Sequence, residues 1–367
     1  MAKYFLIAGE ASGDTHASAL IEQLRVCDSN ASFVGLGGDK IAAAGCRLYQ
    51  HYSRMAFMGF VAVLQNIRTV CQNFHIAQDA LLAEQPDALI LIDYPSFNLR
   101  IAAFCRKHLP NTKIFYYIPP KVWAWKRRRV HQIARLCDEV LGIFPFEPAF
   151  YAKYGYQCTY VGNPTREEIE KYRNNTTRQN IIAILPGSRK SEVLHCLPKM
   201  LTAARRFADY KIVIAAAPGL NDEVYQPYLL DGEKLTRDTY SVVSEAKAAI
   251  VNSGTATLET ALLGCPQVAV YHLAFSRLIG ILRWARPLIF DIPYFTLVNI
   301  LAGKEVIREC IANDFTEQKI VAALESILYD GDYTQKMLAQ YEHIYSALGA
   351  SSPSATAAKI ICKAILH

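Results

Sequence analysis

The stretch KYFLIAGEASGD, residues 3–14, carries the pattern that decides the fold. Its apolar run Tyr4–Ala8 predicts a strand that is buried on both faces, because a strand with one exposed face alternates apolar and polar residues. Gly9 and Gly13 then allow a tight turn, and Thr15–Val26 has the apolar spacing of a helix. A buried strand, a glycine turn and a helix predict a mostly parallel sheet that is covered by helices.

The same alternation continues along both halves of the chain. In the first half, we predict strands at Phe33–Leu36, Ala88–Ile92, Lys113–Ile118, Glu139–Ile143 and Thr159–Val161, and helices at Phe97–His108 and Lys126–Leu136. In the second half, we predict strands at Asn180–Leu185, Lys211–Ala216, Ala248–Asn252 and Gln267–Tyr271, and helices near Glu192–Phe207 and Thr255–Leu263. The sequence therefore predicts an α/β protein with two Rossmann-like domains that face a cleft.

A polar stretch separates the two halves. NPTREEIEKYRNNTTRQ, residues 163–179, is poor in strand-forming residues and suits a linker. Three helical segments end the chain, at Lys319–Leu328, Asp332–Leu348 and Ala355–Leu366, and they could pack back onto the first domain. The predicted domains are residues 1–165, joined by the returning residues 345–367, and residues 166–344.

Length and composition exclude several classes of protein. A chain of 367 residues exceeds the usual size of one domain. With 52% hydrophobic and 20% charged residues it is an ordinary globular protein and not a disordered one. Its net charge of +6 is too small to argue for a nucleic-acid binder.

Cysteine and histidine spacing indicates neither a disulfide scaffold nor a metal site. The ten cysteines are scattered without a C-x-x-C pair, and the nine histidines form no H-x-x-x-H pattern. We expect reduced thiols, no metal and no cofactor. The N-terminus has no signal-peptide pattern, and no window holds 18 uninterrupted apolar residues, so we expect a cytoplasmic protein that is soluble or peripheral to a membrane.

Chemistry is expected in the loops after the strands, because ligands bind at the carboxyl ends of parallel strands. Glu10 follows the first strand, where its carboxylate would face the cleft, and the alternative for this loop is a helix cap made by Ser12 or Asp14. Asp93 follows the strand Ala88–Ile92 and could take the proton of an attacking hydroxyl group. The alternative for Asp93 is a helix cap or a pair with a basic residue.

The loop LPGSRKSEV, residues 185–193, suits a diphosphate. Gly187 and Ser188 allow the backbone to approach a ligand closely, and Arg189 could bind a phosphate oxygen through its forked donors. Glu192 offers a structural alternative, because it could neutralise Arg189.

The loop NSGTATLE, residues 252–259, repeats the order of strand, turn and helix. Ser253, Gly254 and Thr255 present hydroxyl and N–H groups at a helix N-terminus, where a pyrophosphate would bind. Glu259 could hold two ribose hydroxyls. A capping box is the alternative for a serine or threonine followed by this glutamate.

Apolar and basic–aromatic segments predict a membrane-facing surface. Segment 55–82 is nearly uncharged in its first part, and PPKVWAWKRRRVHQ, residues 119–132, places tryptophans beside four basic residues. Segment 275–290 is a second apolar run with arginines. A core helix in segment 55–82 and an RNA site in the basic cluster are the alternatives. The predicted membrane contacts are Phe60, Val61, Val63, Leu64, Ile67, Trp123 and Trp125.

These motifs, in this order, resemble the lipid A disaccharide synthase family of glycosyltransferases over essentially the whole chain. The resemblance rests on AGEASGD, MGF-V-A-V-L at 58–64, DYPSFN, P-x-V-W-A-W at 120–125, FPFE at 144–147, LPGSR, NSGTATLE and VNILAGKE at 298–305. The chain departs from the family pattern at Ser96, where D-x-P-D-F-N has its second aspartate, and at Gly162–Asn163, where Gly-His is usual.

The resemblance implies the glycosyltransferase-B fold and a metal-independent, inverting transfer. The donor would be UDP-2,3-diacylglucosamine, the acceptor 2,3-diacylglucosamine 1-phosphate (lipid X), and the products a β-1,6-linked disaccharide 1-phosphate and UDP, in lipid A biosynthesis. Asp93 would be the base, and Glu10 and Ser12 would be active-site groups. The residues around UDP would be Arg189, Ser253, Gly254, Thr255, Glu259, Asn299 and Glu305. Further partners would be the inner face of the cytoplasmic membrane and a second copy in a homodimer, without nucleic acid.

Two other functions compete with this one. A UDP-sugar 2-epimerase or hydrolase would keep the fold but would act on soluble substrates, without need of the apolar and tryptophan–arginine segments. A nucleotide-sensing membrane adaptor would bind UDP and form no glycosidic product.

Overall fold

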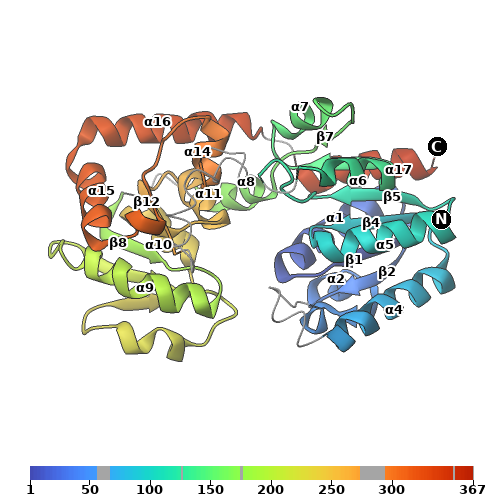
Figure 1. Cartoon of the computed structure of the whole chain (residues 1–367), viewed down its shortest axis with the longest axis horizontal. Helices are drawn as coiled ribbons and strands as arrows, with labels where there is room; N and C mark the ends of the chain where they lie inside the picture. Colours follow the sequence, from blue (N-terminus) through green and yellow to red (C-terminus); the bar gives the residue numbers. More distant parts are fainter. Residues whose placement is uncertain (56–66, 125–126, 174–176, 273–293, 350–351, 367) are drawn as a thin grey trace. The chain divides into compact units, whose positions relative to one another are not determined.

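The computed structural model of the chain describes residues 1–367 except 56–66, 125–126, 174–176, 273–293, 350–351 and 367. The chain forms two compact units, Met1–Pro164 with Ala350–His367, and Thr165–Gly349 (Figure 1). Each unit is built on one parallel sheet with helices packed against it. This confirms the predicted α/β class with two Rossmann-like halves.

The sheet of the first unit has the strand order β3-β2-β1-β4-β5-β6-β7, and neighbouring strands in it pair parallel. Its strands are β1 Lys3–Ala8, β2 Ser32–Gly37, β3 Arg47–His51, β4 Ala88–Ile92, β5 Lys113–Tyr117, β6 Glu139–Gly142 and β7 Thr159–Tyr160. Its helices are α1 Ala11–Cys27, α2 Asp39–Ala43, α4 Ile67–Glu84, α5 Pro95–His108, α6 Arg129–Leu136, α7 Glu147–Ala152 and α17 Pro353–Leu366.

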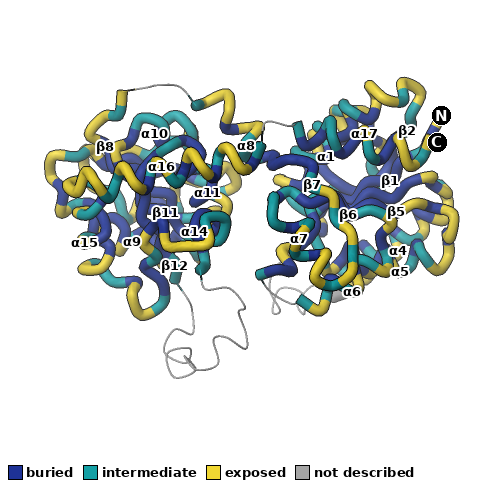
Figure 2. The backbone as a smooth tube through the Cα atoms, turned by 90° about the horizontal axis from the view of Figure 1, so that it is seen from above, coloured by how far each residue is buried: buried dark blue, intermediate teal, exposed yellow. Residues whose placement is uncertain are grey.

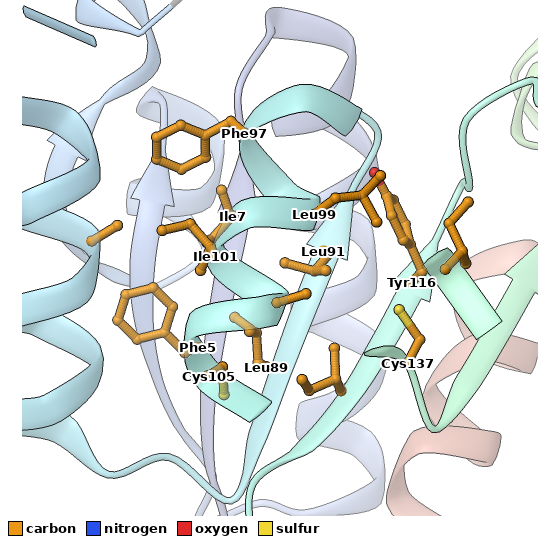
Figure 3. Packing of buried hydrophobic residues seen from close by; sticks show 14 of the residues in the cluster. Phe5, Ile7, Leu89, Leu91, Phe97, Leu99, Ile101, Cys105, Tyr116 and Cys137 are labelled. Atoms are coloured by element: carbon orange, nitrogen blue, oxygen red, sulfur yellow. The ribbon is translucent and has the colours of Figure 1, made fainter. Parts of the chain in front are cut away.

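Burial on both faces explains the uninterrupted apolar run in β1. Phe5 and Ile7 lie in a core cluster with residues of α4, α5 and α6, and Figure 3 shows Ile101 and Cys105 of α5 among this cluster. Tyr4 belongs to the second cluster, with residues of α1 and α17. The side chains of β1 from Tyr4 to Ala8 therefore remove apolar surface from water, the main favourable contribution to folding.

Of the three helical segments at the end of the chain, only the last, α17, returns to the first unit, and the two before it belong to the second unit. Ile361 of α17 is fully buried in the cluster that contains Leu20 and Ile21 of α1, and the Tyr4 hydroxyl lies 3.8 Å from Cys362 Sγ. Figures 1 and 2 both show α17 beside α1. The preceding helix, α16 (Gly331–Ala347), packs against α11 (Thr255–Leu262) in the second unit.

The sheet of the second unit has the strand order β10-β9-β8-β11-β12-β13. Its strands are β8 Gln179–Leu185, β9 Lys211–Ala215, β10 Lys234–Thr236, β11 Ala246–Asn252, β12 Gln267–Tyr271 and β13 Glu309–Ile311. Further helices are α8 Pro164–Ile169, α9 Lys190–Ala204, α10 Thr239–Glu245, α14 Leu297–Ala302 and α15 Glu317–Tyr329. The polar stretch 163–179, interpreted as a linker, begins with α8 and a 3₁₀ turn at Glu170–Tyr172. From Thr165 onward it belongs to the second unit.

One part of the apolar segment 55–82 is a core helix. Ala77, Ala80 and Leu81 of α4 are buried in the core of the first unit. The alternative of a core helix therefore holds for this part of the segment. In the described part of the chain, no helix combines the length and the apolar character that crossing a membrane requires.

Candidate active site

Two loops meet at the carboxyl edge of the first sheet. Ala8 of β1 pairs with Ile92 of β4, so the loops that follow these strands are neighbours. The Tyr94 ring covers Gly9 so closely that a Cβ atom at Gly9 would overlap the ring. This close packing brings Glu10 and the Asp93–Tyr94 pair to the same edge, as the sequence predicted.

The backbone at Asp93 is held in an uncommon conformation. Asp93 and Tyr94 both have φ of 45°, a left-handed conformation that costs a non-glycine residue roughly 1–3 kcal/mol. The Tyr116 hydroxyl donates to the Asp93 carbonyl oxygen at 2.8 Å, and Asn98 Nδ2 donates to the same oxygen at 2.7 Å. These two bonds stabilise the turn, so Tyr116 and Asn98 fix where the Asp93 side chain begins.

Burial raises the pKa of the Asp93 carboxyl above its ordinary value, while the nearby Lys121 ammonium group and the Tyr94 N–H lower it. Lys121 is exposed to solvent. A carboxylate with a raised pKa accepts a proton more readily than an ordinary aspartate. The site can therefore offer a base to a hydroxyl group.

Asp14 has a structural role in this loop. Its carboxylate accepts the backbone N–H groups of Gly38 at 2.7 Å, Lys40 at 3.0 Å and Ile41 at 3.3 Å. Asp14 therefore caps α2 and not its own helix, which corrects the alternative offered for the AGEASGD loop. The first turn of α1 begins at Glu10, whose side chain makes no cap hydrogen bond.

Glu147 of FPFE holds two loops of the site together, a role that was not predicted from the sequence. Its buried carboxylate accepts the N–H groups of Ile143 at 2.8 Å and Phe144 at 2.9 Å, and the indole N–H of Trp123 at 3.2 Å. Burial raises the pKa of Glu147 to about 7. Glu147 ties the loop after β6 to the loop after β5, which carries Lys121. The signal in the sequence was a lone carboxylate inside an aromatic run.

The prediction of membrane contact is wrong for Trp123. Its side chain is buried and packs edge-on against the rings of Phe144 and Phe146, with centroids 5.9 and 5.0 Å away. Because the indole N–H is satisfied by Glu147 inside the protein, the ring does not face a headgroup layer. The other predicted membrane contacts lie outside the described residues: Phe60, Val61, Val63, Leu64, the side chain of Ile67 and Trp125.

A second constellation lies at the carboxyl edge of the second sheet. Leu185 of β8 pairs with Val251 of β11, so the loops after these strands are also neighbours. Gly187 has φ of 118°, and a Cβ atom there would lie 2.7 Å from Asn252 Nδ2. Only glycine fits this turn, which lets the two loops approach one another.

The N-terminus of α11 is open. Gly254 is its N-cap residue, with no side-chain cap, and a Cβ atom at Gly254 would meet nothing within 4 Å. Thr255 is exposed and Ser253 is half-buried. The capping box proposed as the alternative is therefore not formed. Uncapped N–H groups at the positive end of a helix suit a phosphate.

Arg189 is the N-cap residue of α9, and it forms the pair with Glu192 that was offered as its structural alternative. Its Nη1 lies 3.4 Å from Glu192 Oε1, and the arginine side chain is 57% exposed. Glu192 Oε2 also accepts the N–H groups of Ser188 at 3.0 Å and Arg189 at 3.3 Å. A long, exposed ion pair contributes little, so an anionic ligand could compete for this guanidinium.

Glu259 lies in α11 and is half-buried. Burial raises its pKa to about 7, and the charge of Glu168 in α8 adds to this effect. Near neutral pH its carboxyl can therefore donate or accept hydrogen bonds, and its ionised form can accept one from each of two vicinal hydroxyls.

Asn299 does not match its predicted role. It is fully buried, its Oδ1 accepts the N–H groups of Val306 and Ile307, and its Nδ2 donates to Ile307 O and to Glu309 Oε1. These four bonds use the full capacity of the amide, so its side chain holds the following loop and does not contact a ligand. Glu305 in that loop is exposed and pairs with Arg308 at 2.7 Å.

Among the described residues, no group of three or more histidine, cysteine, aspartate or glutamate side chains is placed to hold a metal ion.

Comparisons with known proteins identify the family. The family model described as lipid-A-disaccharide synthetase matches residues 4–362. A lipid-A-disaccharide synthase of Trichlorobacter lovleyi is 34% identical, over 95% of this chain and 93% of the relative. One of Syntrophus aciditrophicus is also 34% identical, over 96% of this chain and 95% of the relative.

Solved structures share the fold at much lower identity. The glycotransferase of kitacinnamycin has a TM-score of 0.64 at 12% identity, covering 99% of both chains. The S. aureus MnaA–UDP co-structure has a TM-score of 0.63 at 12% identity, over 98% of this chain and 95% of that one. A UDP-GlcNAc 2-epimerase from Neisseria meningitidis has a TM-score of 0.55 at 11% identity, covering 99% of both. These likenesses show the fold, and the sequence matches show that the chain belongs to the lipid-A-disaccharide synthetase family.

Proposed function

We propose that this chain transfers 2,3-diacylglucosamine from UDP to lipid X, forming the β-1,6-linked disaccharide 1-phosphate of lipid A and releasing UDP. Family membership over residues 4–362 is the observation that carries the proposal. Two relatives at 34% identity are named for the same synthesis. The fold alone would not choose between a transferase and an epimerase, because solved structures of both share it.

The proposed chemistry begins in the first unit. Asp93 takes the proton of the acceptor hydroxyl as its oxygen attacks the anomeric carbon of the donor. The bond from that carbon to the UDP oxygen breaks, and attack from the opposite face inverts the configuration. Glu10, on the neighbouring loop, and the exposed Ser12 would orient the acceptor sugar.

The second unit would bind UDP. Negative charge that develops on the leaving diphosphate is stabilised by Arg189 and by the N–H groups at the start of α11, beside Ser253, Gly254 and Thr255. Glu259 would bind the ribose hydroxyls. In this arrangement each domain would bind a different partner. Residues 1–165 would contact the acceptor and the membrane, and residues 166–344 would bind the nucleotide.

Product analysis tests the proposal. Purified protein is incubated with synthetic UDP-2,3-diacylglucosamine and lipid X in excess EDTA, and the lipid fraction is examined by mass spectrometry. We expect a disaccharide 1-phosphate whose mass is that of lipid X plus diacylglucosamine less one water. Release of UDP without that product would favour a hydrolase, and conversion of UDP-GlcNAc to its 2-epimer in a parallel incubation with that nucleotide sugar would favour an epimerase. A complete loss in EDTA that magnesium restores would refute the metal-independent mechanism.

We also propose that the protein binds the inner face of the cytoplasmic membrane as a peripheral protein, because both substrates carry acyl chains. Sedimentation with vesicles of anionic and of neutral phospholipid tests this, and we expect the protein to pellet with the anionic ones. A protein that stays in the supernatant with both would contradict it. The homodimer implied by the family resemblance belongs to the same proposal and is tested by sedimentation equilibrium of the purified chain.

A further inference from the structure

Two histidines meet beside the proposed nucleotide site without a role in the chemistry above. His272 follows the last residue of β12, and His195 lies in the second turn of α9. Their rings stack with centroids 4.6 Å apart and an interplanar angle of 15°. The strand pairing Asn252↔Val270 puts the end of β12 next to the loop that carries Ser253. The pair thus lies at the edge where a parallel sheet binds ligands.

A chain of contacts joins this pair to the phosphate loops. Cys196, the residue after His195, donates from Sγ to Asn252 Oδ1 at 3.5 Å. Burial raises the pKa of this thiol to about 11, and a hydrogen bond from the His272 backbone opposes that rise. Asn252 in turn lies against Gly187, the turn glycine of the loop that holds Arg189. The helix turn that carries His195 and the backbone of His272 are therefore joined to the scaffold of the site, while the His195 side chain is exposed and its Nδ1 lies 2.6 Å from the Ser191 carbonyl oxygen.

The charges around His272 are of one sign. Lys199 of α9 donates to the Phe315 carbonyl oxygen at 3.0 Å, and the Phe315 ring lies 6.2 Å from that of His272. Burial lowers the pKa of His272, and the charges of His195 and Lys199 on α9 lower it further. Among the described residues, no salt bridge joins a carboxylate to these three side chains. A bound anion would attract the positive charge on His272 and so offset the repulsion from Lys199 and His195, which favours the protonated imidazole.

We propose that His195 and His272 form part of the diphosphate site, and that nucleotide binding is coupled to protonation of the pair. This inference rests on the proposed function, since it assumes that the second unit binds UDP. The proton comes from solvent, and no covalent step is involved. Linkage requires that an anion which favours the protonated imidazole binds more tightly as the pH falls.

Calorimetry of UDP binding to the full-length chain between pH 7.5 and 5.5 tests the coupling. The variants are His272→Gln and His195→Gln, with His343→Gln as the control, because His343 is an exposed histidine of α16 in the same unit. UDP also titrates in this range, but equally for every protein, so the ratio of dissociation constants between variant and wild type isolates the histidines. A pKa rise of one unit on binding would make this ratio grow about tenfold as the pH falls.

The outcomes distinguish failure of the histidine coupling from failure of UDP binding itself. Growth of the ratio for His272→Gln and His195→Gln, with His343→Gln matching the wild type, supports the inference, provided thermal melts show folded variants. A ratio that is constant with pH overturns it while leaving the nucleotide site intact. If the ratio of dissociation constants grew in the same way with uridine, which lacks phosphate, the two histidines would respond to the nucleoside and not to the diphosphate. That result would also overturn the inference. Failure of the wild type to bind UDP at any pH would overturn the proposed function itself.

Discussion

Asp93 combines a left-handed backbone with a half-buried carboxyl whose pKa is raised by burial. If it is the general base, Asp93→Asn lowers turnover by roughly 10²–10⁴-fold. UDP affinity should stay unchanged, because the nucleotide is proposed to bind the second unit. Steady-state rates and UDP titration measure both quantities. Asp39→Asn, at a 98% exposed aspartate of the same unit, is the control. Near-normal turnover of Asp93→Asn would remove it from the mechanism.

The charge of Lys121 affects the pKa of Asp93 and therefore the pH dependence of turnover. Its ammonium group lowers the pKa of Asp93 against the rise that burial causes. A base must be deprotonated to act, so activity falls as the pH drops through this pKa. Lys121→Met removes the cation and lets the pKa rise further, and the acidic limb of the kcat–pH profile should move to higher pH. Lys107→Met, at an exposed lysine at the end of α5, should leave the limb in place. A limb that stays fixed or moves to lower pH in Lys121→Met would contradict this account.

Arg189 is predicted to bind the diphosphate of UDP. Hydrogen bonds to charged groups contribute about 1.5–3 kcal/mol, so Arg189→Ala should weaken UDP binding by roughly 10- to 100-fold. Calorimetric titration with UDP measures the change. Arg206→Ala, at an exposed arginine of the same unit that pairs with Glu317, should bind UDP like the wild type. Equal affinity of the two variants would argue against a phosphate contact at Arg189.

At the residue scale, the sequence located the loops better than it assigned their side chains. The strand-end rule placed Glu10 and Asp93 on adjoining loops because parallel pairing brings strand ends together. It could not show that the hydrogen-bonding capacity of Asn299 is used inside the protein, since its partners follow seven to ten residues later in a folded loop. Nor could it foresee that Tyr116, on a different strand, would hold the Asp93 backbone.

At the scale of elements, α17 is a separate segment that completes the core of the first unit. Ile361 is fully buried there, whereas Leu366 on the same helix is 41% exposed. Ile361→Ala leaves a cavity and should lower the free energy of unfolding by about 2–5 kcal/mol. Leu366→Ala should change it by at most about 0.5 kcal/mol. Urea unfolding followed by circular dichroism measures both, and equal values would mean that α17 does not contribute to the folded core.

The central strands and one edge strand, β7, could be predicted from the sequence, and the other three edge strands could not. Strands β1, β4, β8 and β11 are covered on both faces and are almost entirely apolar, which makes them visible as runs. The three strands that were missed, β3, β10 and β13, lie at sheet edges and have partly exposed sequences. An edge strand takes its conformation from pairing with its neighbour, so its own residues carry a weak signal.

At the scale of the whole molecule, two units of the same architecture are proposed to divide one reaction. The first unit has carboxylates at its sheet edge, and the second has glycine turns, an open helix N-terminus and an exposed arginine. The fold is shared with epimerases and other transferases. The fold therefore does not set this chain apart, and its family is shown by the sequence match over residues 4–362.

Hydrogen–deuterium exchange with and without UDP tests this division most directly. UDP should slow exchange at residues 186–192 and 252–259, where the amides would contact the diphosphate, and should leave residues 8–14 and 93–98 unchanged. The Arg189→Ala variant, at the same UDP concentration, should show weaker protection at the same two segments. Protection confined to residues 8–14 and 93–98 would contradict the account, because it would place the nucleotide in the first unit beside the proposed base.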